Sequence, residues 1–142
     1  MWKYEQESGA LVRPDGTVLA VGYSGRVPDG RNNPDKQCEQ NVGPIPRGWY
    51  AIGTPRSTTT KPYYMPLSPN AGMDTCGRSA FQIHGDNKTG DASTGCIIVS
   101  PKKLREEIWN SGDRVLRVVR SSSDVTDAKV ATAPVTQFKG KV

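Results

Sequence analysis

Short apolar segments separated by polar, turn-rich stretches recur along most of the chain, which predicts a domain built mainly of β-strands. Residues 2–7, 10–13 and 18–23 are three such segments and predict a β-meander. One of its turns, Pro14-Asp15-Gly16, combines a proline that presets φ with a glycine that accepts positive φ. Further strands are expected at residues 49–52, 63–65, 81–84, 96–99 and 115–119.

A single short helix is expected in the C-terminal third of the chain. Ser100 is the predicted N-cap and Pro101 the predicted first helical residue, positions at which these residue types are favoured. Leu104 and Ile108 lie four positions apart and therefore share one face of the helix. Ser111-Gly112 is a typical helix end.

Two long irregular stretches, residues 24–47 and 54–79, are rich in proline, glycine and polar residues. Loops of this length in a compact domain are usually functional or disordered. From residue 121 the chain is rich in Ser, Thr and Lys and shows no clear period. We therefore expect one compact, mainly β domain with one short helix over residues 1–120, followed by a C-terminal tail over residues 121–142.

The chain is basic, with 19 Lys and Arg residues against 14 Asp and Glu residues and a formal net charge of +5. This charge favours anionic partners such as acidic cell-wall polymer. The basic residues are scattered and aromatic residues make up only 7% of the chain, so no nucleic-acid partner is expected. Because apolar runs are short, no membrane span is expected, and residues 1–5 lack the apolar stretch of a signal peptide.

Three cysteines and one histidine are the residues most suited to covalent catalysis. An odd number of cysteines leaves at least one thiol unpaired. The chain has no C-x-x-C pair, and one histidine cannot complete a common zinc pattern, so neither a metal nor a cofactor is expected. The other two cysteines are either buried or bridged to each other.

The histidine, His84, ends one predicted strand, and Cys96 begins the next. If these strands are antiparallel neighbours, both side chains are presented at one end of the sheet. The thiolate is the nucleophilic form of cysteine, and His84 lies where its base is needed. The amides of Gly95 and Cys96 would then form an oxyanion hole. In the alternative interpretation, Cys96 is a structural core thiol and His84 is an ordinary surface residue.

Five sequence blocks within residues 2–119 carry a resemblance to known enzymes. The blocks are Gly22-Tyr23-Ser24-Gly25, Gly43-Pro44-Ile45-Pro46-Arg47-Gly48-Trp49-Tyr50, Gly77-Arg78-Ser79, Phe81-Gln82-Ile83-His84-Gly85-Asp86 and Ala92-Ser93-Thr94-Gly95-Cys96-Ile97-Ile98. Together they resemble the L,D-transpeptidases of the YkuD type. The closer resemblance is to the small Tlde1-like branch, also called DUF2778, which contains antibacterial effectors of type VI secretion systems. It implies an L,D-transpeptidase-like β-sandwich or barrel with long loops.

The resemblance also implies a function, namely a cysteine-dependent L,D-carboxypeptidase or L,D-transpeptidase that acts on peptidoglycan tetrapeptide stems. Cys96 attacks the carbonyl before the terminal D-alanine, His84 takes and returns the proton, and water or a D-amino acid accepts the acyl group. A type VI secretion component would deliver this toxin to the target-cell periplasm, and an immunity protein would protect the producer. The residues implied to bind or orient the substrate are Tyr23, Arg78, Gly85, Asp86, Ser93 and Thr94.

Two positions depart from the broader family. Thr94 stands where those enzymes usually have a second histidine, and Ile98 stands where they usually have an arginine. Arg78 is the candidate substitute for binding the substrate carboxylate, and a structural salt bridge is an equally good interpretation of it.

The remaining cysteines, Cys38 and Cys76, lie in irregular segments that flank the candidate site. We expect them to form a disulfide in an oxidising periplasm, with two unrelated buried thiols as the alternative.

Rival interpretations of the whole chain come from other classes of protein. A sortase also has its histidine before its cysteine, but usually with a longer interval and an arginine strand after the cysteine. An NlpC/P60 peptidase has the reverse order. The non-enzymatic rival is a cell-wall- or partner-binding β-domain in which Cys96 is structural.

Overall fold

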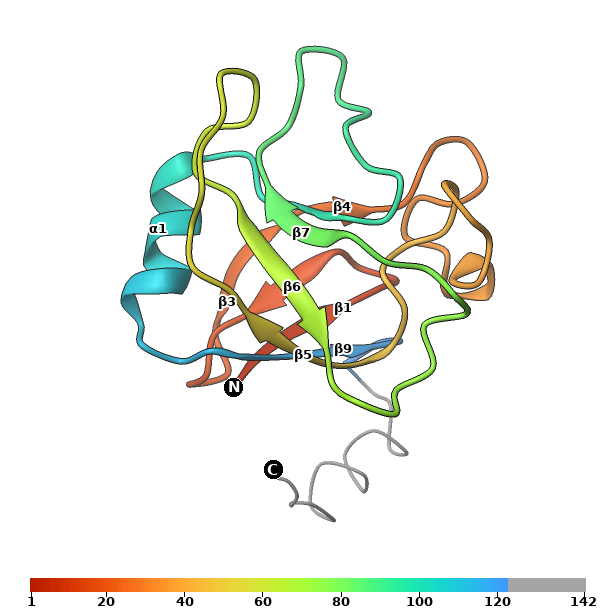
Figure 1. Ribbon diagram of the computed structural model, residues 1–142, viewed down its shortest axis with the longest axis horizontal. Coiled ribbons are helices and arrows are strands. Elements are labelled where there is room, and N and C mark those ends of the chain that lie inside the picture. Colours follow the sequence, from red (N-terminus) through yellow and green to blue (C-terminus); the bar gives the residue numbers. More distant parts are fainter. Residues whose placement is uncertain (123–142) are drawn as a thin grey trace.

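The fold is mainly β with one short α-helix, as the sequence predicts (Figure 1). The computed structural model describes residues 1–122, so nearly all of the predicted tail, residues 121–142, lies outside the described residues. The helical elements are the 3-10 turn η1 (Pro34–Lys36) and α1 (Lys102–Asn110). The strands are β1 (Trp2–Glu5), β2 (Ala10–Val12), β3 (Val18–Val21), β4 (Tyr23–Ser24), β5 (Gly48–Ile52), β6 (Met65–Pro69), β7 (Phe81–His84), β8 (Ile97–Ile98) and β9 (Val115–Val119).

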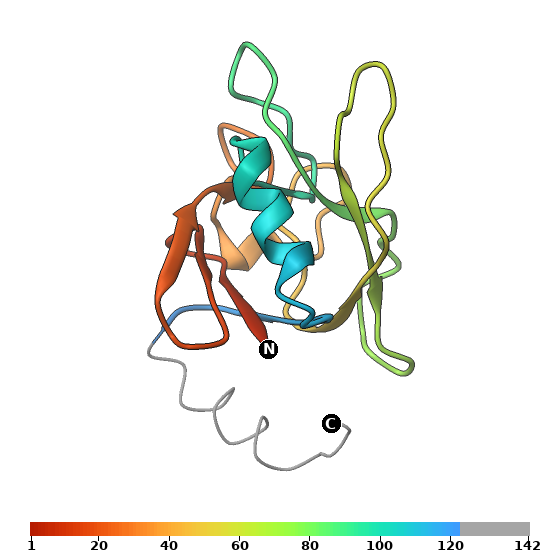
Figure 2. The ribbon, with the colours of Figure 1, turned by 90° about the vertical axis from the view of Figure 1, so that its left-hand side faces the viewer.

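The strands form one sheet in the order β3-β2-β1-β9-β5-β6-β7-β8-β4. Its edge strands, β3 and β4, are separated in the chain by Gly22 alone, so the sheet curls into a nearly closed barrel (Figures 1 and 2). Gly22 is needed at this corner because a Cβ there would lie 1.8 Å from the Ile98 carbonyl oxygen. The Gly22 amide also donates to the Gly9 carbonyl at 2.8 Å, which joins the corner to the turn between β1 and β2.

The hydrophobic core lies inside the barrel and beneath α1. Tyr50 of β5 and Phe81 of β7 meet edge to face within it, with their ring centroids 5.8 Å apart. Burial of apolar surface, at about 25 cal/mol per Å², is the main stabilising contribution. The largest fully buried apolar residues are Trp2, Tyr4, Leu11, Ile45, Tyr50, Met65, Ile83, Ile97, Ile98, Ile108 and Leu116.

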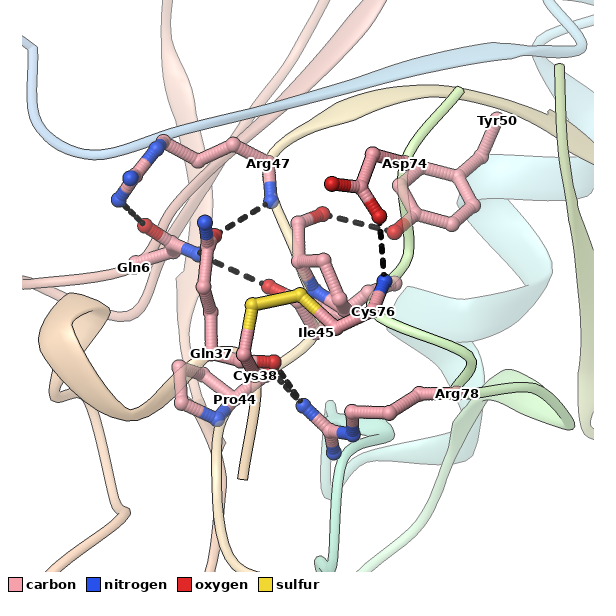
Figure 3. The surroundings of a disulfide bond; sticks show 11 residues. Gln6, Gln37, Cys38, Pro44, Ile45, Arg47, Tyr50, Asp74, Cys76 and Arg78 are labelled. Carbon is pink, nitrogen blue, oxygen red and sulfur yellow. Dashed lines mark hydrogen bonds between the residues drawn. A yellow bond between two sulfur atoms is a disulfide. The ribbon is translucent and has the colours of Figure 1, made fainter. Parts of the chain in front are cut away.

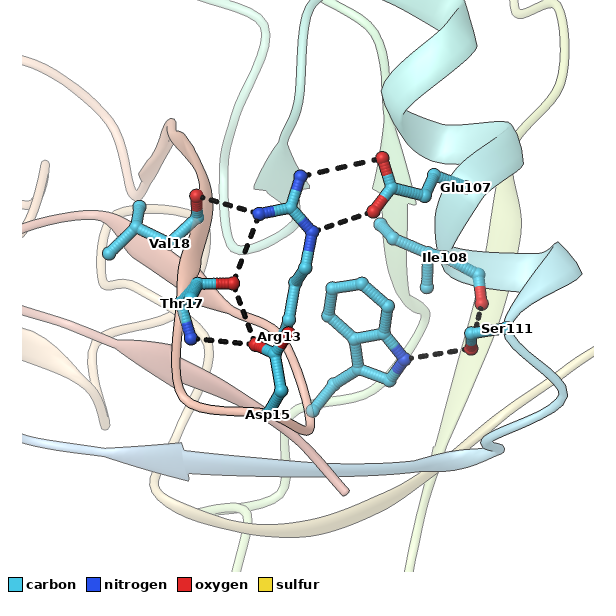
Figure 4. Close-up of polar contacts among 8 residues, drawn as sticks. Arg13, Asp15, Thr17, Val18, Glu107, Ile108 and Ser111 are labelled. Atoms are coloured by element: carbon cyan, nitrogen blue, oxygen red, sulfur yellow. Dashed lines mark hydrogen bonds and ion pairs between the residues drawn. The ribbon is translucent and has the colours of Figure 1, made fainter.

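Polar contacts join α1 to the first strands of the sheet (Figure 4). Arg13, which follows β2, donates from Nε to Glu107 Oε2 at 2.6 Å, and its Nη1 donates to the Val18 carbonyl at 3.1 Å. Trp2 of β1 donates from Nε1 to the Ser111 hydroxyl, 3.1 Å away, just past the end of the helix. These contacts orient the helix that forms one wall of the candidate site.

The start of the helix differs from the sequence prediction. Pro101, and not Ser100, is the N-cap, and it makes no side-chain cap hydrogen bond. The carbonyl of Ser100 instead accepts a hydrogen bond from Arg105 Nη1 at 2.8 Å. Because a helical side chain supports the entry to α1, the hydroxyl of Ser100 is not required there.

The strand predicted at residues 63–65 is displaced to β6, Met65–Pro69. Tyr63 has a positive φ of 49°, and Tyr64 makes only an isolated bridge with Arg56. The prediction was wrong because β6 contains two prolines, Pro66 and Pro69, and proline argues against a strand that is paired on both sides.

Two loops project together from one end of the barrel (Figure 2). They are residues 53–64, between β5 and β6, and residues 85–96, between β7 and β8. None of the helices within residues 1–122 has the length and apolar character needed to cross a membrane. The candidate site lies at the base of these loops.

Candidate active site

His84 and Cys96 lie on neighbouring strands, but these strands are parallel and not antiparallel as the sequence suggested. The register pairs Ile83 with Ile97 and His84 with Ile98. A parallel connection must return the chain along the length of the strand. The loop over residues 85–96 makes this return, and the distance is short because β8 has only two residues.

The parallel register puts Cys96 and His84 on the same face of the sheet. Ile83 and Ile97 are fully buried in the core, so their neighbours along each strand point to the opposite face of the sheet. Cys96, just before β8, therefore lies opposite Gln82 of β7. Gln82 is two residues before His84, which separates the thiol and the imidazole by about 7 Å along the strands.

The Cys96 thiol faces a small cavity of about 150 Å³. Its Sγ lies 3.8 Å from the Ala80 carbonyl oxygen, to which it donates. Burial raises the pKa of the Cys96 thiol, while a backbone hydrogen bond from Gln82 and the charges of Lys61 and Arg78 act in the opposite direction. The thiol is therefore neutral at pH 7 in this conformation. The cavity is lined by Gln40, Asn41, Arg78, Ser79, Ala80, Phe81, Thr94, Gly95 and Cys96.

His84 is buried and has one ring nitrogen free for proton transfer. Its Nδ1 donates to the Gly85 carbonyl at 2.7 Å, which places the proton on Nδ1 and leaves Nε2 as the basic nitrogen. Burial lowers the pKa of His84, and the charges of Lys61 and Arg105 lower it further, against the Gly85 hydrogen bond. The imidazole is therefore neutral at pH 7.

His84 lies in a second depression, of about 460 Å³. This depression has no lining residue in common with the Cys96 cavity. Within residues 1–122 no hydrogen bond joins the imidazole to the thiol, which is directed toward Ala80. The geometry thus presents two neutral groups on one face instead of a thiolate–imidazolium pair. The second depression is lined by Thr60, Lys61, Pro62, His84, Gly85, Asp86, Asn87, Ala92, Ser100, Lys102 and Arg105.

Ser93 holds the chain in place before Cys96. Its hydroxyl accepts from the amides of Gly25 at 2.9 Å and Gly95 at 3.1 Å, and donates to the Cys96 carbonyl at 2.6 Å. The Gly95 amide is therefore occupied and is not directed at a substrate. This corrects the expected oxyanion hole of two amides, which now depends on the Cys96 amide and not on Gly95.

Arg78 has a different role from either of those expected for it. Its Nη1 donates to the carbonyls of Gln37 and Pro44, at 2.6 and 2.8 Å, and its Nη2 donates to those of Gly43 and Thr94, at 2.9 and 3.0 Å. All four terminal N–H groups are used in this way, and the side chain is buried. Arg78 is thus not a free carboxylate ligand, and it forms no salt bridge with any residue of 1–122. The side chain of Thr94 itself is exposed beside the cavity.

The disulfide expected from the sequence is present between Cys38 and Cys76 (Figure 3). Their Cα atoms are 5.2 Å apart, and the bond links positions 38 residues apart in sequence. Arg78 lies just after Cys76, and the Gln37 carbonyl that it binds precedes Cys38. The disulfide and the arginine therefore hold the same loop against the Cys96 side of the site.

Tyr23 anchors both ends of the loop between β7 and β8. Its hydroxyl donates to Asp86 Oδ1 at 2.5 Å and accepts from the Ala92 amide at 2.9 Å. The guanidinium of Arg31 lies 3.6 Å from the centre of the Tyr23 ring. Asp86 is thus bound by Tyr23, and the carbonyl that orients the His84 ring belongs to Gly85.

Arg105 of α1 was missed by the sequence analysis. It is buried and donates from Nε to the Tyr63 carbonyl, from Nη1 to the Val99 and Ser100 carbonyls, and from Nη2 to the Pro62 carbonyl, at 2.8–2.9 Å. Its only sequence signal is its position three residues before the buried Ile108, on the same helix face.

The conformation of the loop near His84 depends on this arginine. A Cβ on Gly85 would lie 2.8 Å from Arg105 Nη1, which explains the glycine after His84. Lys61, which lines the second depression, and its hydrogen-bond partner Gln82 were also missed. No sequence pattern distinguishes them from other polar residues of loops and strands.

Comparison with known proteins gives one match. A family model of the Tlde1 domain matches residues 19–123, which is well over half of the chain and includes the whole candidate site. No curated protein and no solved structure is similar enough to be matched. No group of His, Cys, Asp and Glu within residues 1–122 is arranged to hold a metal ion. The chain therefore belongs to the Tlde1 family, a family of type VI secretion effectors.

Proposed function

We propose that the protein is a cysteine-dependent enzyme that removes or exchanges the terminal D-amino acid of peptidoglycan tetrapeptide stems. This is L,D-carboxypeptidase or L,D-transpeptidase activity, with water or a D-amino acid as acceptor. The observation that carries the proposal is the position of Cys96, the free cysteine, on the same sheet face as His84, the chain's single histidine.

The chemistry begins with rotation of the Cys96 thiol away from Ala80 toward His84. Catalytic hydrogen bonds are often loose before substrate binds and tighten in the complex. His84 Nε2 removes the thiol proton as Sγ attacks the carbonyl carbon before the terminal residue, and the Cys96 amide donates to the oxygen that becomes negative. His84 then protonates the leaving amine, and a thioester remains. Water or a D-amino acid breaks the thioester and regenerates the thiol.

The neutral forms of both groups favour general-base catalysis over a preformed ion pair. Burial lowers the pKa of His84 and raises the pKa of Cys96, so both shifts oppose charge separation before substrate binds. The proton transfer then accompanies attack on the carbonyl. We expect activity to fall on the acidic side only below the ordinary pKa of histidine, about 6.5.

The periplasm of a target cell is the proposed place of action. A disulfide between Cys38 and Cys76 is stable in an oxidising compartment. The net charge of +5 favours association with anionic wall polymer. A type VI delivery component and an immunity protein in the producer are the proposed protein partners.

The direct test incubates purified disaccharide-tetrapeptide with the oxidised protein, with and without an added D-amino acid. Mass spectrometry is expected to show the tripeptide product, and an exchanged tetrapeptide when the D-amino acid is present. Cys96→Ala and His84→Gln are expected to abolish both products while the Cys38–Cys76 bond remains intact. Equal conversion by wild type and Cys96→Ala, or no conversion by either, would overturn the proposal.

A second candidate function, a wall- or partner-binding β-domain, is favoured by the resting position of the thiol. Cys96 Sγ donates to the Ala80 carbonyl and makes no contact with His84 among the residues described. In that case Cys96→Ala would bind purified sacculi as wild type does, and iodoacetamide would modify Cys96 only at the rate of an ordinary thiol. Faster alkylation, slowed by His84→Gln, favours the enzyme.

A further inference from the structure

The cations around the two depressions differ in how many donors they have free. The terminal N–H groups of Arg78 all bind backbone carbonyls, and Arg105 donates four hydrogen bonds to carbonyls. Lys102 is exposed, and its Nζ lies 3.3 Å from Glu106 Oε2. The fourth cation, Lys61, binds neither a backbone carbonyl nor a carboxylate among the residues described.

Lys61 is a half-buried ammonium group held by a neutral side chain. Its Nζ donates to Gln82 Oε1 at 2.9 Å and lies 5.4 Å from the centre of the Tyr64 ring. No carboxylate within residues 1–122 forms an ion pair with it. An ammonium has three N–H donors, and a partly desolvated cation is stabilised by an anion. Lys61 therefore has donors and charge available for a ligand.

The position of Lys61 relates it to both reacting groups. Gln82 lies opposite Cys96 when the parallel register is extended by one residue, and it is two residues before His84, so the residue that holds the ammonium is a near neighbour of both groups. The charge of Lys61 acts on the pKa of both His84 and Cys96, in each case downward. This agrees with an ammonium that lies within electrostatic reach of both depressions.

We propose that Lys61 binds the carboxylate of the ligand at this site. For the proposed peptide substrate, this is the terminal carboxylate of the residue that leaves, one residue beyond the carbonyl that Cys96 attacks. A carboxylate bound at Lys61 positions that carbonyl between the thiol and His84. The identity of the peptide rests on the proposed function, whereas the preference for a carboxylate rests on Lys61 alone.

The first test needs no substrate. Cys96 in the oxidised protein is alkylated in parallel with iodoacetate, which has a carboxylate, and with iodoacetamide, which does not. The ratio of the two rates is expected to fall about fivefold in Lys61→Met, equivalent to an ion pair of about 1 kcal/mol. Lys61→Arg keeps the ratio near that of wild type. Lys102→Met is the matched control, because it removes a charge from the same depression and is expected to leave the ratio unchanged.

A ratio in Lys61→Met equal to that of wild type overturns the inference. An equal fall of the rate ratio in Lys61→Met and Lys102→Met also overturns it, because the effect would then come from the overall positive charge of the depression and not from Lys61. Both results can be read whether or not the protein acts on peptidoglycan.

The second test uses the tetrapeptide and its C-terminal carboxamide. Wild type is expected to have the lower KM for the free acid, and Lys61→Met is expected to raise that KM about tenfold without raising the KM for the amide. An unchanged preference in Lys61→Met overturns the inference. Absence of activity in wild type on both peptides overturns the proposed function instead. The alkylation ratios then test separately whether Lys61 binds a carboxylate.

Discussion

The two sides of the candidate site are built on the same device, a buried arginine that binds backbone carbonyls. Arg78 does so beside Cys96, and Arg105 does so beside His84, each with four hydrogen bonds. The two sides differ in whether a covalent bond also holds the loop. The loop bound by Arg78 is also tied by the Cys38–Cys76 disulfide, whereas the loop over residues 53–64, bound by Arg105, contains no cysteine.

The comparison explains how irregular segments remain in place around the Cys96 thiol. Buried backbone carbonyls need donors, and loops lack the regular partners that helices and strands provide. The planar guanidinium supplies several donors at once, and a carbonyl shell offsets part of the cost of burying its charge. The Cys96 side is also fixed by a covalent bond, whereas the loop that carries Lys61 is not.

The largest expected effect comes from removing each arginine. Arg105→Met leaves its carbonyls without donors and is expected to lower the free energy of unfolding by about 4 kcal/mol. Arg78→Met is expected to cost about 3 kcal/mol, because the disulfide still holds its loop. Urea denaturation of the oxidised proteins measures both. Arg13→Met, which removes an exposed ion pair, is the control and is expected to cost less than 1 kcal/mol. A larger loss for Arg78→Met than for Arg105→Met would contradict the comparison.

Removing the disulfide separates the two sides directly. The double variant Cys38→Ser, Cys76→Ser is expected to lose about 3 kcal/mol of stability, because the unfolded chain gains freedom. Amide hydrogen exchange is expected to speed up at residues 37–44 and to change little at residues 53–64. Wild type treated with a reductant should behave as the double variant does. Equal acceleration in both loops would mean that the disulfide does not act on the Cys96 side specifically.

Two glycines allow a smaller test, because each lies against one of the arginines. A Cβ on Gly95 would lie 2.5 Å from Arg78 Nη2 at a φ of +146°, and a Cβ on Gly85 would lie 2.8 Å from Arg105 Nη1. Gly95→Ala is expected to cost about 2 kcal/mol and Gly85→Ala about 1 kcal/mol. Gly16→Ala separates strain from crowding, since Gly16 has a φ of +94° and a Cβ there would meet no surrounding atom within 4 Å. A larger loss of stability for Gly85→Ala than for Gly95→Ala would contradict the comparison.

The smallest effect is the pH dependence of stability from His84. Its pKa is lower in the folded protein than the ordinary 6.5, mainly because of burial, so the unfolded chain binds the proton more tightly. The free energy of unfolding is therefore expected to fall as pH drops from above 6.5 through the lowered folded pKa. Urea midpoints at pH 7.5 and pH 5 test this, with His84→Gln showing a smaller difference than wild type. An equal difference in the variant would show that other groups cause it.

Much of the fold could be predicted because its signals are local. The alternating residues of β7 need only their own side chains to show one buried face. The single helix likewise follows from a short segment, and an unpaired thiol follows from the odd number of cysteines. The prolines of β6 are the exception, since proline normally excludes a strand paired on both sides.

The site could be predicted only in part. His84 and Cys96 were identified by residue type and by their place at strand ends. The direction of the strands was wrong, because it depends on the path of the connecting loop. The roles of Gly95 and Arg78 were also wrong. In both cases the partner is a group, a hydroxyl or a backbone carbonyl, that the neighbouring sequence does not indicate.

The sequence by itself determined that this is a small, mainly β domain with one helix and a cysteine that follows the only histidine. Those properties depend on composition and on contacts between near neighbours in the chain. Only the tertiary structure decided which strands pair in parallel, which arginines hold the loops, and that Lys61 lines the same depression as His84. Every residue has the same backbone carbonyl, so a side chain that binds carbonyls leaves no pattern in the sequence, and its partners are known only when the chain has folded.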